Sequence, residues 1–95
     1  MTRYLSLLRF TEQGIKNLED STTRAAAFRE AASKAGVNVE TQFWTTGSYD
    51  GVLIFSAKDE TTALRCLSAL GAAGNVTTET LRAFDAKEFE AIAGK

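Results

Sequence analysis

The order of strand-like and helix-like segments constrains the fold of this chain more than any other feature of its sequence. Stretches rich in β-branched and aromatic residues predict strands, and apolar residues at three- and four-residue spacing predict helices. Strands are expected over residues 3–10, 37–46, 49–57 and 75–84, and helices over residues 21–35, 58–74 and, briefly, 85–93. The order β-α-β-β-α-β predicts an α+β, ferredoxin-like fold: a four-stranded antiparallel sheet with two helices on one face, followed by a short C-terminal helix.

The ends of the two long helices carry capping residues. Ser21 and Asp59 are expected as N-caps, because their side-chain oxygens can accept hydrogen bonds from backbone N–H groups of the first turn. Gly36 is expected just beyond the first helix, and Gly71 or Gly74 at the end of the second. A short helical turn is also expected near residues 15–18.

The turn between the second and third strands predicts which residues share a face. Gly47 and Ser48 suit a two-residue type II′ loop, which places Trp44 opposite Gly51. Because cross-strand partners share a face, one face collects residues that suit packing under the helices: Val37, Val39, Phe43, Val52 and Ile54. The other face is a mixed surface that suits an oligomer contact or a ligand: Gln42, Trp44, Tyr49, Leu53 and Phe55.

The strand expected over residues 49–57 is apolar on both of its faces. Two helices on one side of a sheet can cover only one of these faces, so the other needs a further cover. A second copy of the chain is the expected cover, which predicts a homodimer or a higher oligomer.

Length and charge narrow the class of protein. The 95 residues suit a single domain over residues 1–95, and eleven Lys and Arg balance twelve Asp and Glu, so we expect no nucleic-acid partner. No stretch approaches the ~20 apolar residues that span a bilayer, and Arg9 interrupts the apolar N-terminal stretch without a cleavage site after it. We therefore expect no membrane partner and a cytoplasmic location.

The sequence contains no histidine and one cysteine, Cys66. This composition removes Ser-His-Asp and Cys-His nucleophile pairs, the usual proximal haem ligand and the commonest zinc ligand. We expect neither a metal nor a cofactor. Cys66 lies among leucines and is expected to fill the core as an unreactive thiol.

Three loops are expected to meet at one end of the sheet. In this topology the chain leaves the first strand, turns between the second and third, and enters the fourth at the same end, near the start of the first long helix. The rim formed by residues 10–14, 44–50 and 74–75 is the predicted binding site. Its candidate ligand-binding residues are Phe10, Gln13, Trp44, Gly47, Tyr49, Asp50 and Asn75.

The motifs along this rim resemble those of the GYD domain family over nearly the whole chain. They are Phe10-Thr11 with Gln13-Gly14, then Trp44, Gly47 and Tyr49-Asp50, then Gly74-Asn75-Val76 running into residues 79–84. The signature Gly, Tyr and Asp of the family map onto Gly47, Tyr49 and Asp50, with Ser48 where relatives often carry a charged residue. The resemblance implies a ferredoxin-like fold akin to the dimeric α/β barrels and no well-established activity.

Several functions fit these residues. The first is a homo-oligomeric module that binds a small molecule or a protein partner at the rim. The alternative is a cofactor-independent enzyme in which Asp50 and Tyr49 do acid/base work on a small apolar substrate; both residues could instead only stabilise the hairpin. Trp44 could stack on a ligand or only cover the backbone at Gly51. An RNA-binding module shares the layout but is disfavoured, because Asp50 would repel phosphates.

Overall fold

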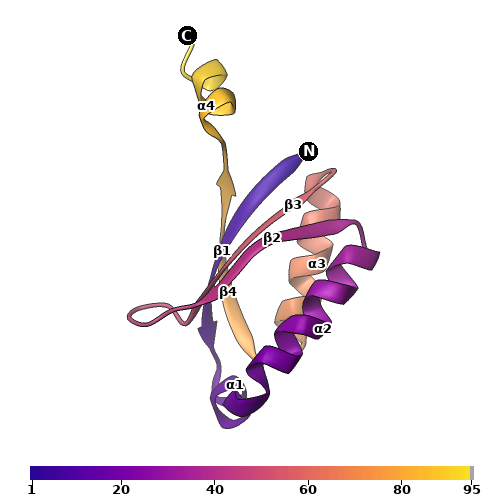
Figure 1. The fold of residues 1–95 in the computed structure, drawn as a ribbon, viewed down its shortest axis with the longest axis vertical. Helices are drawn as coiled ribbons and strands as arrows, with labels where there is room; N and C mark the ends of the chain where they lie inside the picture. The colour runs from indigo at the N-terminus through magenta and orange to yellow at the C-terminus, as the bar shows by residue number, and fades with distance from the viewer. Residues whose placement is uncertain (95) are drawn as a thin grey trace.

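The computed structural model describes residues 1–94 and has one four-stranded antiparallel sheet in the order β2-β3-β1-β4. The central strands are β1 (Thr2–Phe10) and β3 (Gly51–Ala57), and the edge strands are β2 (Val37–Trp44) and β4 (Val76–Ala83). The helices α2 (Ser21–Lys34) and α3 (Glu60–Ala72) lie side by side over one face of the sheet (Figure 1). The predicted α+β, ferredoxin-like fold is therefore confirmed.

Three shorter elements complete the fold. A helix, α1 (Glu12–Lys16), and a 3₁₀ turn, η1 (Leu18–Asp20), connect β1 to α2, and α4 (Ala86–Ile92) follows β4. The expected helical turn near residues 15–18 is thus two consecutive elements. In residues 1–94 no helix combines the length and the apolar character needed to cross a membrane.

The capping predictions are partly confirmed. The Asp59 carboxylate accepts a hydrogen bond from the Thr62 backbone N–H at 2.8 Å, and this bond lowers the pKa of Asp59. Gly36 (φ +86°) follows α2, and the residue with the same conformation beyond α3 is Gly74 (φ +84°). The predicted N-cap at Ser21 is wrong, because η1 runs directly into α2 and makes Ser21 its first helical residue.

The predicted assignment of sheet faces is wrong, although the register across Trp44 and Gly51 is confirmed. A β-bulge between Val39 and Thr41 inserts an extra residue into β2, and alternation changes face at such a bulge. The face under the helices therefore carries Tyr4, Val37, Val39, Leu53 and Phe55. Phe43, Val52 and Ile54, expected under the helices, lie on the opposite face with Leu5 and Leu7.

The core lies between this face and the two helices. Leu53 and Phe55 are each 1% exposed, and the rings of Tyr4 and Phe55 stack with their centroids 5.4 Å apart. The helices contribute small side chains, including Ala32 and Ala63. Cys66 is half-buried against this core, and its burial raises the pKa of the thiol.

The overall shape is extended rather than spherical. The hairpin loop after Trp44 projects on the side away from α2 and α3, and α4 projects past the end of the sheet (Figure 1). The Cα radius of gyration is 14.1 Å, against about 12.4 Å for a typical compact domain of this length. The hairpin loop and α4 therefore stand away from the body of the domain.

Candidate functional site

Backbone and side-chain hydrogen bonds bring the three predicted loops together at one end of the sheet. The Thr11 hydroxyl donates to the Gly74 carbonyl at 2.6 Å, and the Thr11 N–H donates to the Asn75 carbonyl at 3.1 Å. From the hairpin, Asp50 accepts a hydrogen bond from the Phe10 N–H at 2.8 Å through Oδ2. Its own N–H donates to the Leu8 carbonyl at 2.7 Å. The loops are thus fixed to the end of β1.

Gly14 permits the closest of these approaches. A Cβ atom at this position would lie 2.1 Å from the Asn75 carbonyl oxygen and 3.2 Å from the Phe10 ring. Only glycine lets the backbone of α1 lie this close to the loop before β4. The Gln13-Gly14 motif therefore has a structural explanation.

A pocket of about 410 Å³ lies behind this rim, between the helices and the sheet. Leu53 and Leu8 lie on the sheet side, and Phe28 of α2 and Leu70 of α3 line the pocket from the helices. Five alanines of α2, α3 and the C-cap of α3 contribute further lining, and their small side chains leave the space open: Ala25, Ala27, Ala31, Ala69 and Ala73. The volume falls in the range of about 300–1,000 Å³ that is usual for small-molecule sites.

Few charged groups reach this apolar space. Asp50 and Arg24 are the charged residues of its lining, and Asn75 and Gln42 add polar groups. The Trp44 indole N–H donates to the Ser21 hydroxyl at 2.9 Å, which ties β2 to the start of α2. In residues 1–94 no three side chains of the His, Cys, Asp and Glu types are grouped as a metal site would require.

Of the seven predicted ligand-binding residues, four line the pocket and three lie outside it. Those that line the pocket are Phe10, Trp44, Asp50 and Asn75. Gln13 lies outside this lining and donates to the Ala73 carbonyl and to Asn75 Oδ1, at 3.0 and 3.1 Å. Gly47 lies in the exposed hairpin loop with φ +97° and no neighbour near its missing Cβ.

The structure does not bring Tyr49 and Asp50 together as an acid/base pair. The Tyr49 hydroxyl donates to Glu79 of β4 at 3.2 Å, and the Arg9 guanidinium lies 4.4 Å from the centre of the Tyr49 ring. Arg9 and Glu79 belong to the face of the sheet that points away from the helices, the open face, whereas Asp50 lines the pocket on the helix side. The two candidate catalytic residues therefore point to different surfaces.

Sequence reasoning missed the helix side of the pocket, above all Arg24, Phe28 and Leu70. A signal for it was present in the spacing of the helical alanines. Ala27 and Ala31 are four residues apart, as are Ala69 and Ala73, so each pair places small side chains on one helix face.

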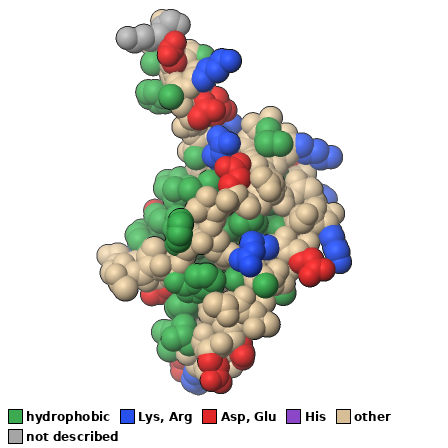
Figure 2. Space-filling model, in the orientation of Figure 1, with side chains coloured by type: hydrophobic (Ala, Val, Ile, Leu, Met, Phe, Trp, Pro, Cys, Tyr) green, Lys and Arg blue, Asp and Glu red, His purple; other side chains and the backbone are tan. Residues whose placement is uncertain are grey.

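The open face of the sheet is a second surface of note. Leu5, Leu7, Val52 and Ile54 on the central strands are half-buried, and the flanking Phe43 is 61% exposed. Figure 2 shows hydrophobic side chains gathered on the side of the molecule away from α2 and α3. The domain thus combines a pocket under the helices with an apolar sheet face that no element of residues 1–94 covers.

Comparison with known proteins places this domain in a family. The GYD domain model matches residues 4–93, and the chain belongs to the GYD domain family. The chain is similar to a solved structure, the crystal structure of TTHA0845 from Thermus thermophilus. The two are 27% identical with a TM-score of 0.57, and the similarity covers 90% of this chain and 96% of the other. No curated protein matched the chain.

Proposed function

We propose that this protein is a homodimeric module that binds a small, largely apolar molecule in the pocket between α2, α3 and the sheet. The single observation that carries the proposal is the pocket itself. Its walls are apolar, its volume of about 410 Å³ suits a small organic molecule, and hydrogen bonds fix the loops around it. An apolar ligand that fills such a space adds dispersion contacts and stabilises the folded chain.

The polar groups of the wall favour a ligand with a hydrogen-bond donor. The Asp50 carboxylate uses Oδ2 for the Phe10 N–H, and within residues 1–94 no donor reaches its Oδ1. A ligand N–H or O–H at this point would supply that donor, because an ionised carboxylate only accepts hydrogen bonds. Arg24 donates to the Asn17 carbonyl at 2.6 Å, so one of its N–H groups is already occupied.

The area of the molecule supports the dimer. The chain exposes 6219 Å², whereas a compact monomer of 10.3 kDa exposes about 5,400 Å². The excess of roughly 800 Å² equals what one partner buries in an interface of standard size. The open sheet face supplies apolar area for such an interface.

Charge on the open face also favours a second copy. Arg3 pairs with Glu40 at 2.9 Å, and Tyr49 contacts both Arg9 and Glu79, so the face carries charges of both signs within one chain. A two-fold contact places the same patch on both sides, and a patch of one charge sign would repel its copy. The aliphatic centre of the face suits packing between proteins better than stacking of nucleotide bases.

Fluorescence titration with N-phenyl-1-naphthylamine tests the ligand site, because this probe is flat, apolar and carries one N–H group. We expect saturable enhancement with one probe per chain. Ala27→Phe should weaken binding at least tenfold by filling the pocket, and the matched control Ala26→Phe should bind like the parent, since Ala26 is exposed and outside the lining. Equal binding by both variants, or no saturable binding, would overturn the proposal.

A further inference from the structure

The short helix α4 stands apart from the rest of the chain. None of its seven residues is buried, and it makes no extensive contact with another element of residues 1–94 (Figure 1). Isolated helices shorter than about 12–15 residues are marginal in water, because too few hydrogen bonds offset the cost of nucleation. Packing on something outside this chain would supply the missing stability.

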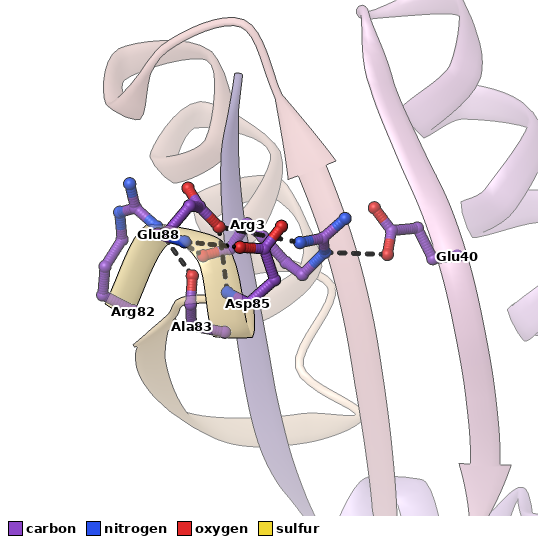
Figure 3. Close-up of polar contacts among 6 residues, drawn as sticks. All are labelled: Arg3, Glu40, Arg82, Ala83, Asp85 and Glu88. Atoms are coloured by element: carbon purple, nitrogen blue, oxygen red, sulfur yellow. Dashed lines mark hydrogen bonds and ion pairs between the residues drawn. The ribbon is translucent and has the colours of Figure 1, made fainter. Parts of the chain in front are cut away.

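The base of α4 is organised, which argues against a frayed end. The Asp85 carboxylate accepts the Glu88 N–H at 2.8 Å, and Glu88 accepts the Asp85 N–H at 2.9 Å, a reciprocal capping box. Arg3 lies 3.9 Å from Glu88 and 2.9 Å from Glu40, so it links α4 to the sheet (Figure 3). The helix begins in a defined place and direction.

One side of α4 is apolar and exposed. Phe89 and Ile92 are 57% and 59% exposed, and their three-residue spacing places them on the same side of the helix. On the open sheet face, Leu81 of the neighbouring strand β4 is also 47% exposed. Arg3, which belongs to the open face, borders the same helix.

We infer that α4 is an arm that packs Phe89 and Ile92 onto a second copy of the chain. The inference rests on the proposed dimer, because a copy seated on the open face would lie next to α4. The excess surface of roughly 800 Å² matches one side of a standard interface, and α4 carries part of that excess away from the body. In the dimer each protomer then contributes one arm and receives another, as two-fold symmetry requires.

Sedimentation velocity of the full chain and two variants tests this inference. Phe89→Glu places a charge on the apolar side of α4, and Ala91→Glu places the same charge on its opposite side. We expect Phe89→Glu to raise the dimer dissociation constant at least tenfold and Ala91→Glu to leave it within twofold. Circular dichroism melting checks that each variant remains folded.

The outcomes separate the arm from the dimer. A parent chain that is monomeric at about 50 μM would refute the dimer, and the arm with it. A dimeric parent whose dissociation constant is unchanged by Phe89→Glu would overturn the arm and leave the dimer standing. As a second readout, hydrogen exchange of the α4 amides should slow as protein concentration rises. Protection that stays the same at concentrations below and above the dimer dissociation constant would mean that α4 packs on its own chain, against the inference.

Discussion

Gly14→Ala is the substitution for which the structure predicts the largest effect at the rim. The new methyl group would lie 2.1 Å from the Asn75 carbonyl oxygen, whereas Cβ atoms in proteins essentially never lie within 3.0 Å of such a neighbour. The neighbouring atom is backbone, so α1 or the loop before β4 must move by about 1 Å or more. That movement would strain the two hydrogen bonds from Thr11 to Gly74 and Asn75.

The magnitude follows from these contacts. Overpacking costs about 1–3 kcal/mol, and each of the two weakened hydrogen bonds adds about 0.5–1.5 kcal/mol, which together give about 2–6 kcal/mol. In a domain of this size each kcal/mol lowers Tm by about 4–8 °C, so we expect a loss of at least about 8 °C. Calorimetry or circular dichroism melting measures it.

Gly71→Ala is the matched control within the same chain. Gly71 lies inside α3 with nothing near its missing Cβ, so alanine should stabilise the helix by about 0.5–1 kcal/mol and raise Tm by a few degrees. If Gly14→Ala melted within 2 °C of the parent, the close approach of α1 to the loop before β4 would be refuted.

Three further predictions concern single side chains. Asp50→Ala should lower stability by about 1–3 kcal/mol, measured by urea unfolding, because the half-buried Phe10 N–H loses its acceptor; unchanged stability would contradict that bond. The hydrogen bond from Arg3 lowers the pKa of the Glu40 carboxyl. This ion pair therefore stabilises the fold fully above the unfolded-state pKa of Glu40, about 4.3, and the stabilisation is lost as pH falls through the lower folded-state pKa. Glu40→Gln should therefore show a smaller loss of Tm on acidification, and an equal loss would count against the pair. Native Cys66 should react with a thiol reagent more slowly than in denaturant, because burial raises its pKa; equal rates would contradict its packing.

The element order and the rim could be predicted from the sequence because both depend on local signals. Turn glycines, the Asp59 cap and alternating strands act over a few residues, and the ferredoxin-like topology then places the three loops at one end. The meeting of Thr11, Asp50 and Asn75 with the end of β1 follows from that topology.

Which strand residues lie under the helices could not be predicted, because one inserted residue in β2 decides it. The bulge at Glu40 shifts Val37 and Val39 to the face of Leu53 and Phe55, and nothing in the sequence of β2 marks it. In the structure, the face that we expected to form an oligomer contact therefore lies under the helices. Alternation of apolar and polar residues along a strand shows which side chains share a face only where the hydrogen-bonded ladder between the strands is regular.

The rim of the pocket could be predicted from the sequence, but its helix wall could not, for a different reason. Its rim residues carry distinctive polar and aromatic side chains, whereas its helix wall consists mainly of alanines such as Ala27 and Ala69. An alanine is an equally good sign of close helix packing, and only the pocket in the structure shows that these alanines leave a space. Tyr49 and Asp50 precede the regular ladder, which begins at Trp44 and Gly51, so the different directions of their side chains are set by their own contacts with Glu79 and Phe10.

The proposed function is tested most directly by locating the residues to which an apolar ligand binds. Two-dimensional ¹H–¹⁵N NMR of the labelled chain, titrated with N-phenyl-1-naphthylamine, reports it residue by residue. We predict that the largest shifts fall on amides around the pocket, at Ala27, Leu53 and Asn75, and that they are lost in Ala27→Phe. Shifts concentrated instead at Leu7 and Ile54 on the open face, or no saturable shifts, would contradict the pocket as the binding site.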